Sequence, residues 1–203
     1  MTERTTWFDL IRHGEPDGGQ RYRGHLDDPL SATGWAQMRA AIGEQEQWDA
    51  VLTSPLRRCH DFAADLARQR RLPLYVAPGL KEISFGDWEG HTLEQLQRCD
   101  GERLAAFWAD GERHPPPNGE HLGAFHHRVR AAWRHWSREL AGQRVLLVGH
   151  GGMIRMVLAE VLRIEPAHAM TCLVVPYAGR SRLRLDEGAH GRLVSLVCHG
   201  VLP

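Results

Sequence analysis

The sequence lacks an excess of charge of either sign, and it almost lacks lysine. Its 203 residues carry 25 basic and 25 acidic side chains, which gives a formal net charge of zero, and Lys81 is the single lysine. A neutral chain has no overall field that attracts a polyanion or an anionic membrane, so we expect neither a nucleic acid nor a membrane as a partner. Because nearly every basic residue is an arginine, one arginine alone indicates little about function.

Paired cysteines, a secretion signal and a membrane-spanning run are also missing. The four cysteines stand far apart and form no C-x-x-C pair, which is typical of reduced thiols rather than of a disulfide framework or a zinc ribbon. Charged side chains interrupt both the N-terminal segment 1–6 and the most apolar stretch, 153–164. The sequence therefore predicts a cytoplasmic protein with neither export signal nor membrane span.

Apolar runs rich in β-branched residues predict the strands of the fold. With 42% apolar residues, the chain has the composition of a globular protein that buries one sizeable core. The predicted strands are residues 5–11, 50–53, 74–77, 144–148 and 171–175, with a C-terminal hairpin over 182–185 and 193–197. Helical patterns lie between the strands, and continuous apolar runs are typical of buried parallel strands. The order predicts an α/β fold with a largely parallel sheet.

A long insertion is predicted within this single domain, which we place at residues 1–203. The strands ending at Ala77 and starting at Arg144 are 66 residues apart, several times the length of an ordinary crossover. Apolar residues that step by three or four predict a helix from Leu122 to Leu140 with one face in the core. The prolines at 115–117 exclude a helix just before it and favour a lid loop. We therefore expect a helical insertion at about 82–143.

Polar clusters follow three of the predicted strands. They stand at 12–15, at 53–59 and at 149–152, and each contains a histidine or an arginine. In open parallel sheets, ligands bind beyond the carboxyl ends of the strands, often at a helix N-terminus, so these segments are expected to face one pocket. Guanidinium groups bind phosphate oxygens, and flanking cations would keep His13 neutral and able to attack phosphorus. The clusters predict a phosphate site with His13 as nucleophile.

Four ordered motifs resemble those of the histidine phosphatase superfamily, in its phosphoglycerate-mutase-like branch. They are R-H-G-E at 12–15, S-P-L-x-R at 54–58, L-K-E-x-x-F-G-x-W-E-G at 80–90 and G-H-G-G at 149–152. R-Y-R-G at 21–24 with D-P-L-S at 28–31 is most similar to the α-ribazole phosphatases of cobalamin biosynthesis. The resemblance implies a three-layer α/β/α fold with a mostly parallel central sheet and a helical lid insertion.

The same resemblance implies a role for each matching residue. His13 would become phosphorylated, and Glu82 would protonate the leaving oxygen. The implied ligands of the transferring phosphoryl group are Arg12, Arg58 and His150. Gly151, in the last motif, would also lie at the phosphate, because a glycine lets the backbone approach this group closely. Phosphoryl transfer needs a nucleophile, charge clamps and an acid, so neither a metal nor a cofactor is expected.

The implied function is hydrolysis of a small-molecule phosphomonoester through a phosphohistidine, with α-ribazole 5′-phosphate as the substrate. Broad-specificity sugar-phosphate or phosphoglycerate phosphatases and mutases share much of the pattern and stay open, as does a catalytically silent phospholigand-binding module. The missing C-terminal extension of the glycolytic mutases favours hydrolysis. The oligomeric state is open, a homodimer included.

Several further residues have two interpretations. Arg57 is either a site residue or a surface residue of a helix, and we favour the surface residue. His121 either contacts the substrate or only opens the following helix, and we favour the helix start. Four aromatic residues of the insertion could stack on a ring of the leaving group, although aromatic residues in helices are more often core. These four are Trp88, Phe107, Trp108 and Trp133.

Overall fold

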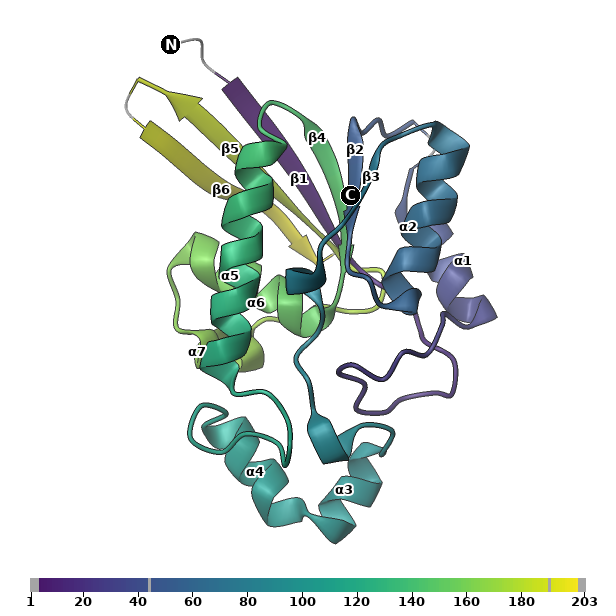
Figure 1. The fold of residues 1–203 in the computed structure, drawn as a ribbon, viewed down its shortest axis with the longest axis vertical. Helices are drawn as coiled ribbons and strands as arrows, with labels where there is room; N and C mark the ends of the chain where they lie inside the picture. The colour runs from purple at the N-terminus through teal and green to yellow at the C-terminus, as the bar shows by residue number, and fades with distance from the viewer. Residues whose placement is uncertain (1–3, 44, 190, 201–203) are drawn as a thin grey trace.

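A six-stranded sheet forms the middle layer of the computed structural model, which describes residues 4–43, 45–189 and 191–200 (Figure 1). Its strands are β1 (Arg4–Arg12), β2 (Ala50–Thr53), β3 (Leu74–Val76), β4 (Arg144–Gly149), β5 (Arg180–Gly188) and β6 (Gly191–Gly200), in the order β3-β2-β4-β1-β5-β6. The pairs formed among β1 to β4 are parallel, whereas β5 runs antiparallel to both β1 and β6. The mostly parallel sheet and its C-terminal hairpin confirm the prediction.

Helices cover both faces of this sheet. The helices of the described residues are α1 (Ala32–Ala41), α2 (Arg57–Arg70), α3 (Leu93–Cys99), α4 (Gly101–Ala109), α5 (Leu122–Glu139), α6 (Gly151–Leu162) and α7 (Pro166–Cys172), with short 3-10 turns η1 (Pro78–Leu80) and η2 (Gly86–Trp88). Of these helices, α3 and α4 do not lie on the sheet. Successive side chains of a strand point to opposite faces. Accordingly, Leu147 packs in the core that contains α5 and α6, and its neighbour Leu146 packs in the core that contains α1 and α2. The fold is the expected three-layer α/β/α arrangement.

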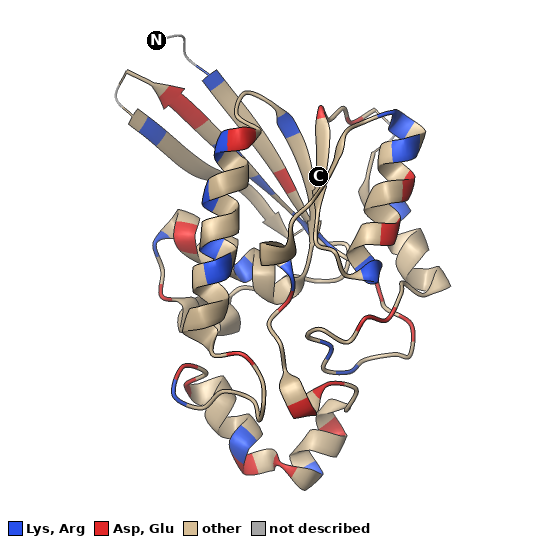
Figure 2. Ribbon diagram, in the orientation of Figure 1, with Lys and Arg blue, Asp and Glu red and all other residues tan. Residues whose placement is uncertain are grey.

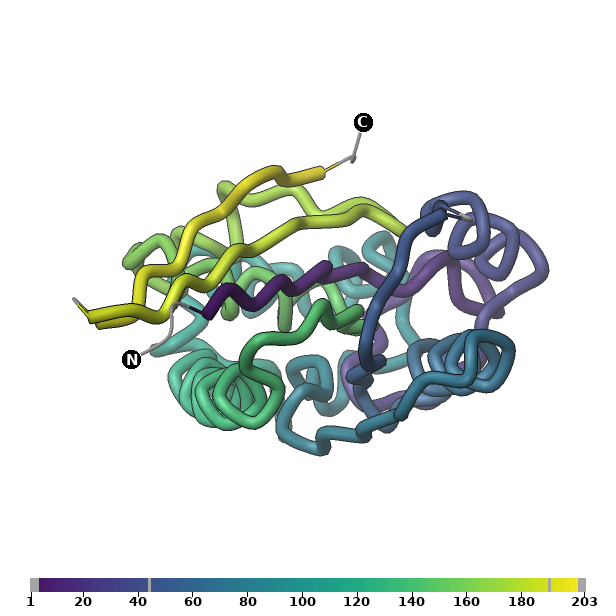
Figure 3. Tube along the Cα trace, turned by 90° about the horizontal axis from the view of Figure 1, so that it is seen from above, coloured from purple at the N-terminus to yellow at the C-terminus, as the bar shows by residue number. Residues whose placement is uncertain are grey.

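The helix predicted over 122–140 is α5, which ends one residue earlier. Its apolar face packs on the sheet, where the rings of Phe8 and Trp133 lie 4.9 Å apart, edge to face. Seen from above, α5 lies against one side of the strand layer (Figure 3). The β5–β6 hairpin forms one edge of that layer. Sequence periodicity alone was enough to predict this helix because its stripe of apolar residues is continuous.

The strand predicted at 171–175 is wrong. Residues 166–172 form α7, which has Pro166 in its first turn, where a fixed φ and a missing N–H suit a helix. The following chain is extended but pairs with no strand of the described residues, and Val174 is 74% exposed. The carbonyls of Leu173 and Val175 accept hydrogen bonds from arginine side chains instead of from a neighbouring strand.

Residues 82–143 contain η2, α3, α4 and α5. Helices α3 and α4 lie away from the sheet, beyond the end at which β1 and β4 finish (Figure 1). The loop between β1 and α1 is joined to this segment, because the backbone of Tyr22 exchanges hydrogen bonds with His91 and Gly90. Helices α3 and α4 and this loop therefore stand together beyond the carboxyl edge of the parallel strands, whereas α5 lies against a face of the sheet.

Charged side chains of both signs are scattered over the elements (Figure 2). In the described part of the chain, no helix combines the length and the apolar character needed to cross a lipid bilayer.

Candidate active site

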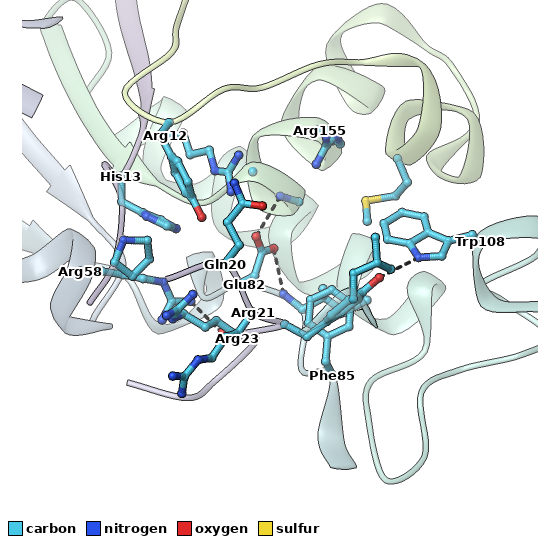
Figure 4. Close-up of a pocket in the computed structure, with 18 residues that line it drawn as sticks. Arg12, His13, Gln20, Arg21, Arg23, Arg58, Glu82, Phe85, Trp108 and Arg155 are labelled. Atoms are coloured by element: carbon cyan, nitrogen blue, oxygen red, sulfur yellow. Dashed lines mark hydrogen bonds between the residues drawn. The ribbon is translucent and has the colours of Figure 1, made fainter. Parts of the chain in front are cut away.

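One pocket lies at the carboxyl ends of β1, β2 and β4. Its cavity has a volume of about 420 Å³. Figure 4 shows Arg12, His13 and Arg58 on one side of this pocket, with Glu82 in the middle and Trp108 on the far side. Five of the six predicted site residues line it, namely Arg12, His13, Arg58, Glu82 and Gly151. The structure therefore brings together residues from segments far apart in the sequence. The sixth residue, His150, does not line the pocket but is buried beside His13.

His13 follows directly after β1, and its ring is held in one tautomer. The side chain is 5% exposed, and its Nδ1 lies 2.7 Å from the carbonyl oxygen of Gly14. A carbonyl oxygen only accepts hydrogen bonds, so Nδ1 carries the proton and donates it. The other ring nitrogen, Nε2, then keeps its lone pair. His13 therefore presents a nitrogen nucleophile without needing to lose a proton.

The electrostatic surroundings also keep His13 neutral. Burial, and then the positive charges of Arg58 and Arg12, hold the pKa of His13 well below its usual value. Burial disfavours the charged imidazolium, and nearby cations disfavour it further. At neutral pH the ring is therefore uncharged, which is the state that can attack an electrophile.

His150 is the N-cap residue of α6 and is fully buried. Its Nε2 lies 2.7 Å from the Ser54 hydroxyl oxygen, and its ring centroid lies 5.3 Å from that of His13, edge to face. Burial, followed by Arg58 and His13, holds its pKa well below the usual value. The neighbouring Cys59 is also buried, which raises the pKa of its thiol, so this sulfur stays protonated and is no competing nucleophile.

These two histidines predict an acid-sensitive fold. Their unfolded pKa is near 6.5 and their folded pKa lies well below it, so below pH 6.5 the unfolded chain binds protons that the folded chain does not. We expect the free energy of unfolding to fall with pH by up to about 1.4 kcal/mol per pH unit for each histidine, until the folded pKa is reached. Urea denaturation at several pH values between 7 and 5 measures this slope.

A matched pair of variants isolates this effect from other titrating groups. The variant His13→Asn removes one of the two histidines and should reduce the slope. The variant His168→Asn changes an exposed histidine of α7 and should leave the slope as it is. Equal slopes in the wild-type protein and His13→Asn would contradict the depressed pKa of His13.

Arg12 ends β1 and reaches across to the segment after α7. Its Nη1 donates to the carbonyl oxygen of Val175 at 2.7 Å, and its guanidinium carbon lies 4.1 Å from the centre of the Tyr177 ring. Its Nε is buried and has no hydrogen-bond partner in the described part of the chain. A buried donor without a partner is uncommon in folded proteins and calls for an acceptor.

Arg58 stands in the first turn of α2 and is only 1% exposed. Its Nη1 donates to the Leu26 carbonyl at 2.8 Å, and its Nη2 donates to the Gly24 carbonyl at 2.8 Å. Among the described residues, its buried Nε again has no partner. Arg58 is thus fixed by the loop between β1 and α1.

Glu82 lies between η1 and η2 and faces the N-terminus of α6. Its Oε2 accepts a hydrogen bond from the Gly152 N–H at 2.9 Å, and its Oε1 accepts one from the Ile83 N–H at 3.0 Å. A Cβ atom at position 152 would lie 2.4 Å from Oε1, so only a glycine permits this approach. The carboxyl group is therefore held at a defined place in the pocket wall.

The pocket contains residues for which sequence reasoning assigned no role. Arg155 lies one helical turn after Gly151, so the i,i+4 spacing of one helix face could have indicated it. Arg23 was noted only as part of a motif, yet it is 6% exposed and lines the pocket. Tyr177 follows α7, and its place beside Arg12 carries no signal in the sequence.

Other residues weighed from the sequence lie outside the pocket. Arg57 is exposed, with its Nε 3.5 Å from the Asp61 carboxylate. His121 precedes α5, and its Nδ1 lies 3.3 Å from the Glu112 carbonyl. Of the four aromatic candidates, Trp108 lines the pocket, whereas the other three are core residues with at most 4% exposure, namely Trp88, Phe107 and Trp133.

Comparison with known proteins identifies a family. A family model described as the histidine phosphatase superfamily (branch 1) matches residues 8–199. The chain is 34% identical over 165 residues to an adenosylcobalamin/α-ribazole phosphatase of Escherichia coli, across 79% of this chain and 81% of that protein. It is 33% identical over 166 residues to a glucosyl-3-phosphoglycerate phosphatase of Mycolicibacterium vanbaalenii, across 75% of this chain and 72% of that protein.

Solved structures show the same two kinds of relative. The α-ribazole phosphatase from Shigella flexneri superposes with a TM-score of 0.77 at 30% identity, over 94% of this chain and 95% of that one. A mycobacterial glucosyl-3-phosphoglycerate phosphatase superposes with a TM-score of 0.82 at 27% identity, over 99% of this chain and 100% of that one. Both kinds of relative are named phosphatases, but their substrates differ.

Proposed function

The chain belongs to the histidine phosphatase superfamily and is a phosphatase, and we propose that it hydrolyses phosphomonoesters through a phosphohistidine formed at Nε2 of His13. The observation that carries this proposal is the state of His13. Its ring is neutral, its Nδ1 proton is engaged by Gly14, and it stands beside two guanidinium groups that each keep one buried N–H without a partner among the described residues.

The reaction has two steps, phosphorylation of His13 and hydrolysis of the phosphohistidine. In the first, Nε2 of His13 attacks phosphorus, the ester P–O bond breaks, and a protonated Glu82 gives its proton to the leaving oxygen. In the second, Glu82 takes a proton from water, the water oxygen attacks phosphorus, and the P–N bond breaks to release phosphate and neutral His13. Arg12 and Arg58 stabilise the charge on the non-bridging oxygens throughout. His150, which the resemblance implies as a further ligand of the phosphoryl group, stands edge to face beside the His13 ring.

For the substrate, we propose α-ribazole 5′-phosphate. The pocket wall opposite His13 contains the aromatic residues Tyr22, Phe85 and Trp108. The Trp108 Nε1–H donates to the Tyr22 hydroxyl at 3.0 Å, which holds two of these rings together. Such a wall suits a flat aromatic group such as the dimethylbenzimidazole of this substrate. In this proposal, the part of the insertion before α5, which contains η2, α3 and α4, forms the lid over the leaving group.

A second candidate is a phosphomonoester whose leaving group carries a carboxylate, as in glucosyl-3-phosphoglycerate. The observation that favours it is Arg155, which lines the pocket near Glu82 (Figure 4). Its Nε donates to the Leu173 carbonyl at 2.8 Å, and it forms no ion pair within the described residues. A guanidinium group next to the leaving-group side would bind a carboxylate there.

Substrate profiling of two variants separates these candidates. If α-ribazole 5′-phosphate is the substrate, Trp108→Ala should lower its kcat/KM about tenfold, because an aromatic contact is lost, while Arg155→Gln should have little effect on it. Preferred turnover of glucosyl-3-phosphoglycerate, with the larger loss in Arg155→Gln, would favour the second candidate. A mutase would transfer the phosphoryl group to another hydroxyl instead of releasing phosphate. If the protein hydrolysed none of the phosphomonoesters tested, the proposal would be overturned.

A further inference from the structure

Glu89 belongs to the W-E-G motif at 88–90, and the proposed mechanism gives it no task. It follows η2, and its side chain is partly buried. Its carboxylate accepts hydrogen bonds from two loops that are far apart in the sequence. From the loop between β1 and α1, the N–H of His25 donates to Oε1 at 2.8 Å, and the N–H of Leu26 donates to Oε2. From the segment before η2, the N–H of Phe85 donates to Oε1 at 3.0 Å.

The first of these loops is the one that anchors Arg58. The carbonyl oxygens of Leu26 and Gly24 accept hydrogen bonds from Arg58, each at 2.8 Å. Leu26 therefore binds Glu89 through its N–H and Arg58 through its carbonyl oxygen. A Cβ at Gly24 would lie 2.2 Å from Glu89 Oε1, so the loop backbone also packs directly on this carboxylate. The place of the Arg58 guanidinium thus depends on a loop that Glu89 holds.

The second loop carries Glu82, and it touches the first loop at two further points. The Nε2 of His25 lies 3.0 Å from the Glu82 carbonyl oxygen, and because this oxygen only accepts, Nε2 is the donor. A Cβ at Gly24 would lie 2.4 Å from the carbonyl oxygen of Ile83. Ile83 is also the residue whose N–H donates to Glu82 Oε1 at 3.0 Å. The contact between the two loops therefore reaches the segment that sets the Glu82 carboxylate.

Arg58 and Glu82 come from different elements but face one pocket (Figure 4). In the proposed mechanism, Arg58 binds a non-bridging oxygen and Glu82 serves the leaving oxygen of the same phosphorus. A misplacement of about 1 Å can slow an enzymatic step about 100-fold. A residue that fixes the separation of these two groups therefore affects the rate without touching the substrate. Glu89 is not among the described residues that line the pocket.

We propose that Glu89 is a positioning residue that fixes the loop of Glu82 against the loop that anchors Arg58; this inference rests on the proposed function. A carboxylate suits this task because both of its oxygens accept hydrogen bonds and neither donates. A glutamine at position 89 has one accepting oxygen, and its NH₂ group would face an N–H donor of one of the loops. The variant Glu89→Gln therefore keeps the size of the side chain but loosens the joint between the loops.

Two readouts follow the two loops separately. Glu89→Gln should slow the hydrolysis of glycerol 2-phosphate, an alkyl phosphate, about 10- to 100-fold. It should slow that of p-nitrophenyl phosphate much less, because only the alkoxide needs the proton of Glu82. In calorimetric titration, the same variant should bind inorganic phosphate about tenfold more weakly, because Arg58 is displaced. The control Glu102→Gln makes the same change at an exposed residue of α4, and it should alter neither readout more than about twofold.

A purely structural role of Glu89 predicts a different result. Urea denaturation of Glu89→Gln would then show a lower free energy of unfolding, but the folded variant would keep the wild-type phosphate affinity and the wild-type ratio of the two hydrolysis rates. This result would overturn the proposal. A change in only one of the two readouts would also overturn it, because the proposal requires Glu89 to act on both loops. If Glu89→Gln does not fold, Glu89→Asp replaces it, which keeps the charge but shortens the side chain by one methylene.

A double-mutant cycle keeps this inference apart from the proposed function. In a Glu82→Gln background the proton donor is already lost, so Glu89→Gln should slow the alkyl phosphate no more than it slows the aryl phosphate. The full additional loss on the alkyl phosphate in this background would contradict an action through Glu82. If Glu82→Gln has its expected effect but Glu89→Gln changes neither readout, the inference fails alone. If Glu82→Gln slows both esters equally, the acid role in the proposed function fails, and the phosphate titration still decides whether Glu89 positions Arg58.

Discussion

Replacing His13 with alanine is expected to lower kcat/KM for any phosphomonoester by about 10⁴- to 10⁶-fold, because the nucleophile is lost. The buried, neutral ring is the one group in the described pocket that presents a free nitrogen lone pair, since the arginines there are charged. Release of phosphate from an aryl phosphate measures this loss. The substituted protein should still bind inorganic phosphate, because the guanidinium groups remain.

Labelling locates the intermediate. Wild-type protein quenched during turnover of a phosphate-labelled ester should carry acid-labile, base-stable label on His13, and His13→Gln should carry none. Glutamine fills part of the space of the ring and stays uncharged, so a folded His13→Gln protein serves as the control for packing. Label at another residue, or activity in His13→Ala within about tenfold of wild type, would show that a different group attacks phosphorus.

Replacing Glu82 with glutamine is expected to slow the hydrolysis of alkyl phosphates by about 10²- to 10⁴-fold. An alkoxide is a poor leaving group and needs the proton that Glu82 supplies. An aryl phosphate such as p-nitrophenyl phosphate leaves as a stabilised phenolate, so the first step on it should slow much less. Single-turnover rates of wild type and Glu82→Gln on both substrates give the loss on the alkyl phosphate relative to the loss on the aryl phosphate. An equal loss on both would show that Glu82 positions groups rather than donates a proton.

A second variant perturbs Glu82 without removing it. Both oxygens of Glu82 accept hydrogen bonds, from the backbone N–H groups of Gly152 and Ile83. In a glutamine at this position, the NH₂ group would face one of these N–H groups, so that two donors would stand opposite each other. The variant Gly152→Ala instead places a methyl group against the carboxylate, and it should reproduce the loss on alkyl phosphates. Gly101→Ala is the matched control, because a Cβ at that position has no neighbouring atom within 4 Å.

The sequence was a good guide to elements that carry a local pattern. The apolar runs at 5–11, 50–53, 74–77 and 144–148 became β1 to β4. The pattern is clearest in β2 and β4, which are central strands buried on both faces, whereas β3 is a partly exposed edge strand. The run at 171–175 has a similar composition but no strand to pair with. Arg12 and Arg155 bind its carbonyls instead, and contacts with such distant residues leave no periodic signal.

For the site, strand order predicted the right place but not all of the residues. Parallel strands end at one edge, so the polar clusters after β1, β2 and β4 were expected to meet there. Each cluster contributes at least one residue to the pocket, and His150 lies beside His13. Arg23 and Arg155 were missed because this chain is rich in arginine, which makes a single one uninformative. Their place in the wall of the pocket became visible only in three dimensions.

The sequence by itself determined the α/β order, the chemistry at the strand ends and the resemblance to a family, because these depend on residue types at fixed spacings. Only the tertiary structure decided that Gly14 fixes the tautomer of His13, that His150 lies behind that ring, and that Glu82 is held by Gly152, which is 70 residues away along the chain. The physical reason is that burial and charge state arise from contacts between distant segments, and that the tautomer depends on how the backbone after β1 is folded. The spacing of residues along a chain specifies neither.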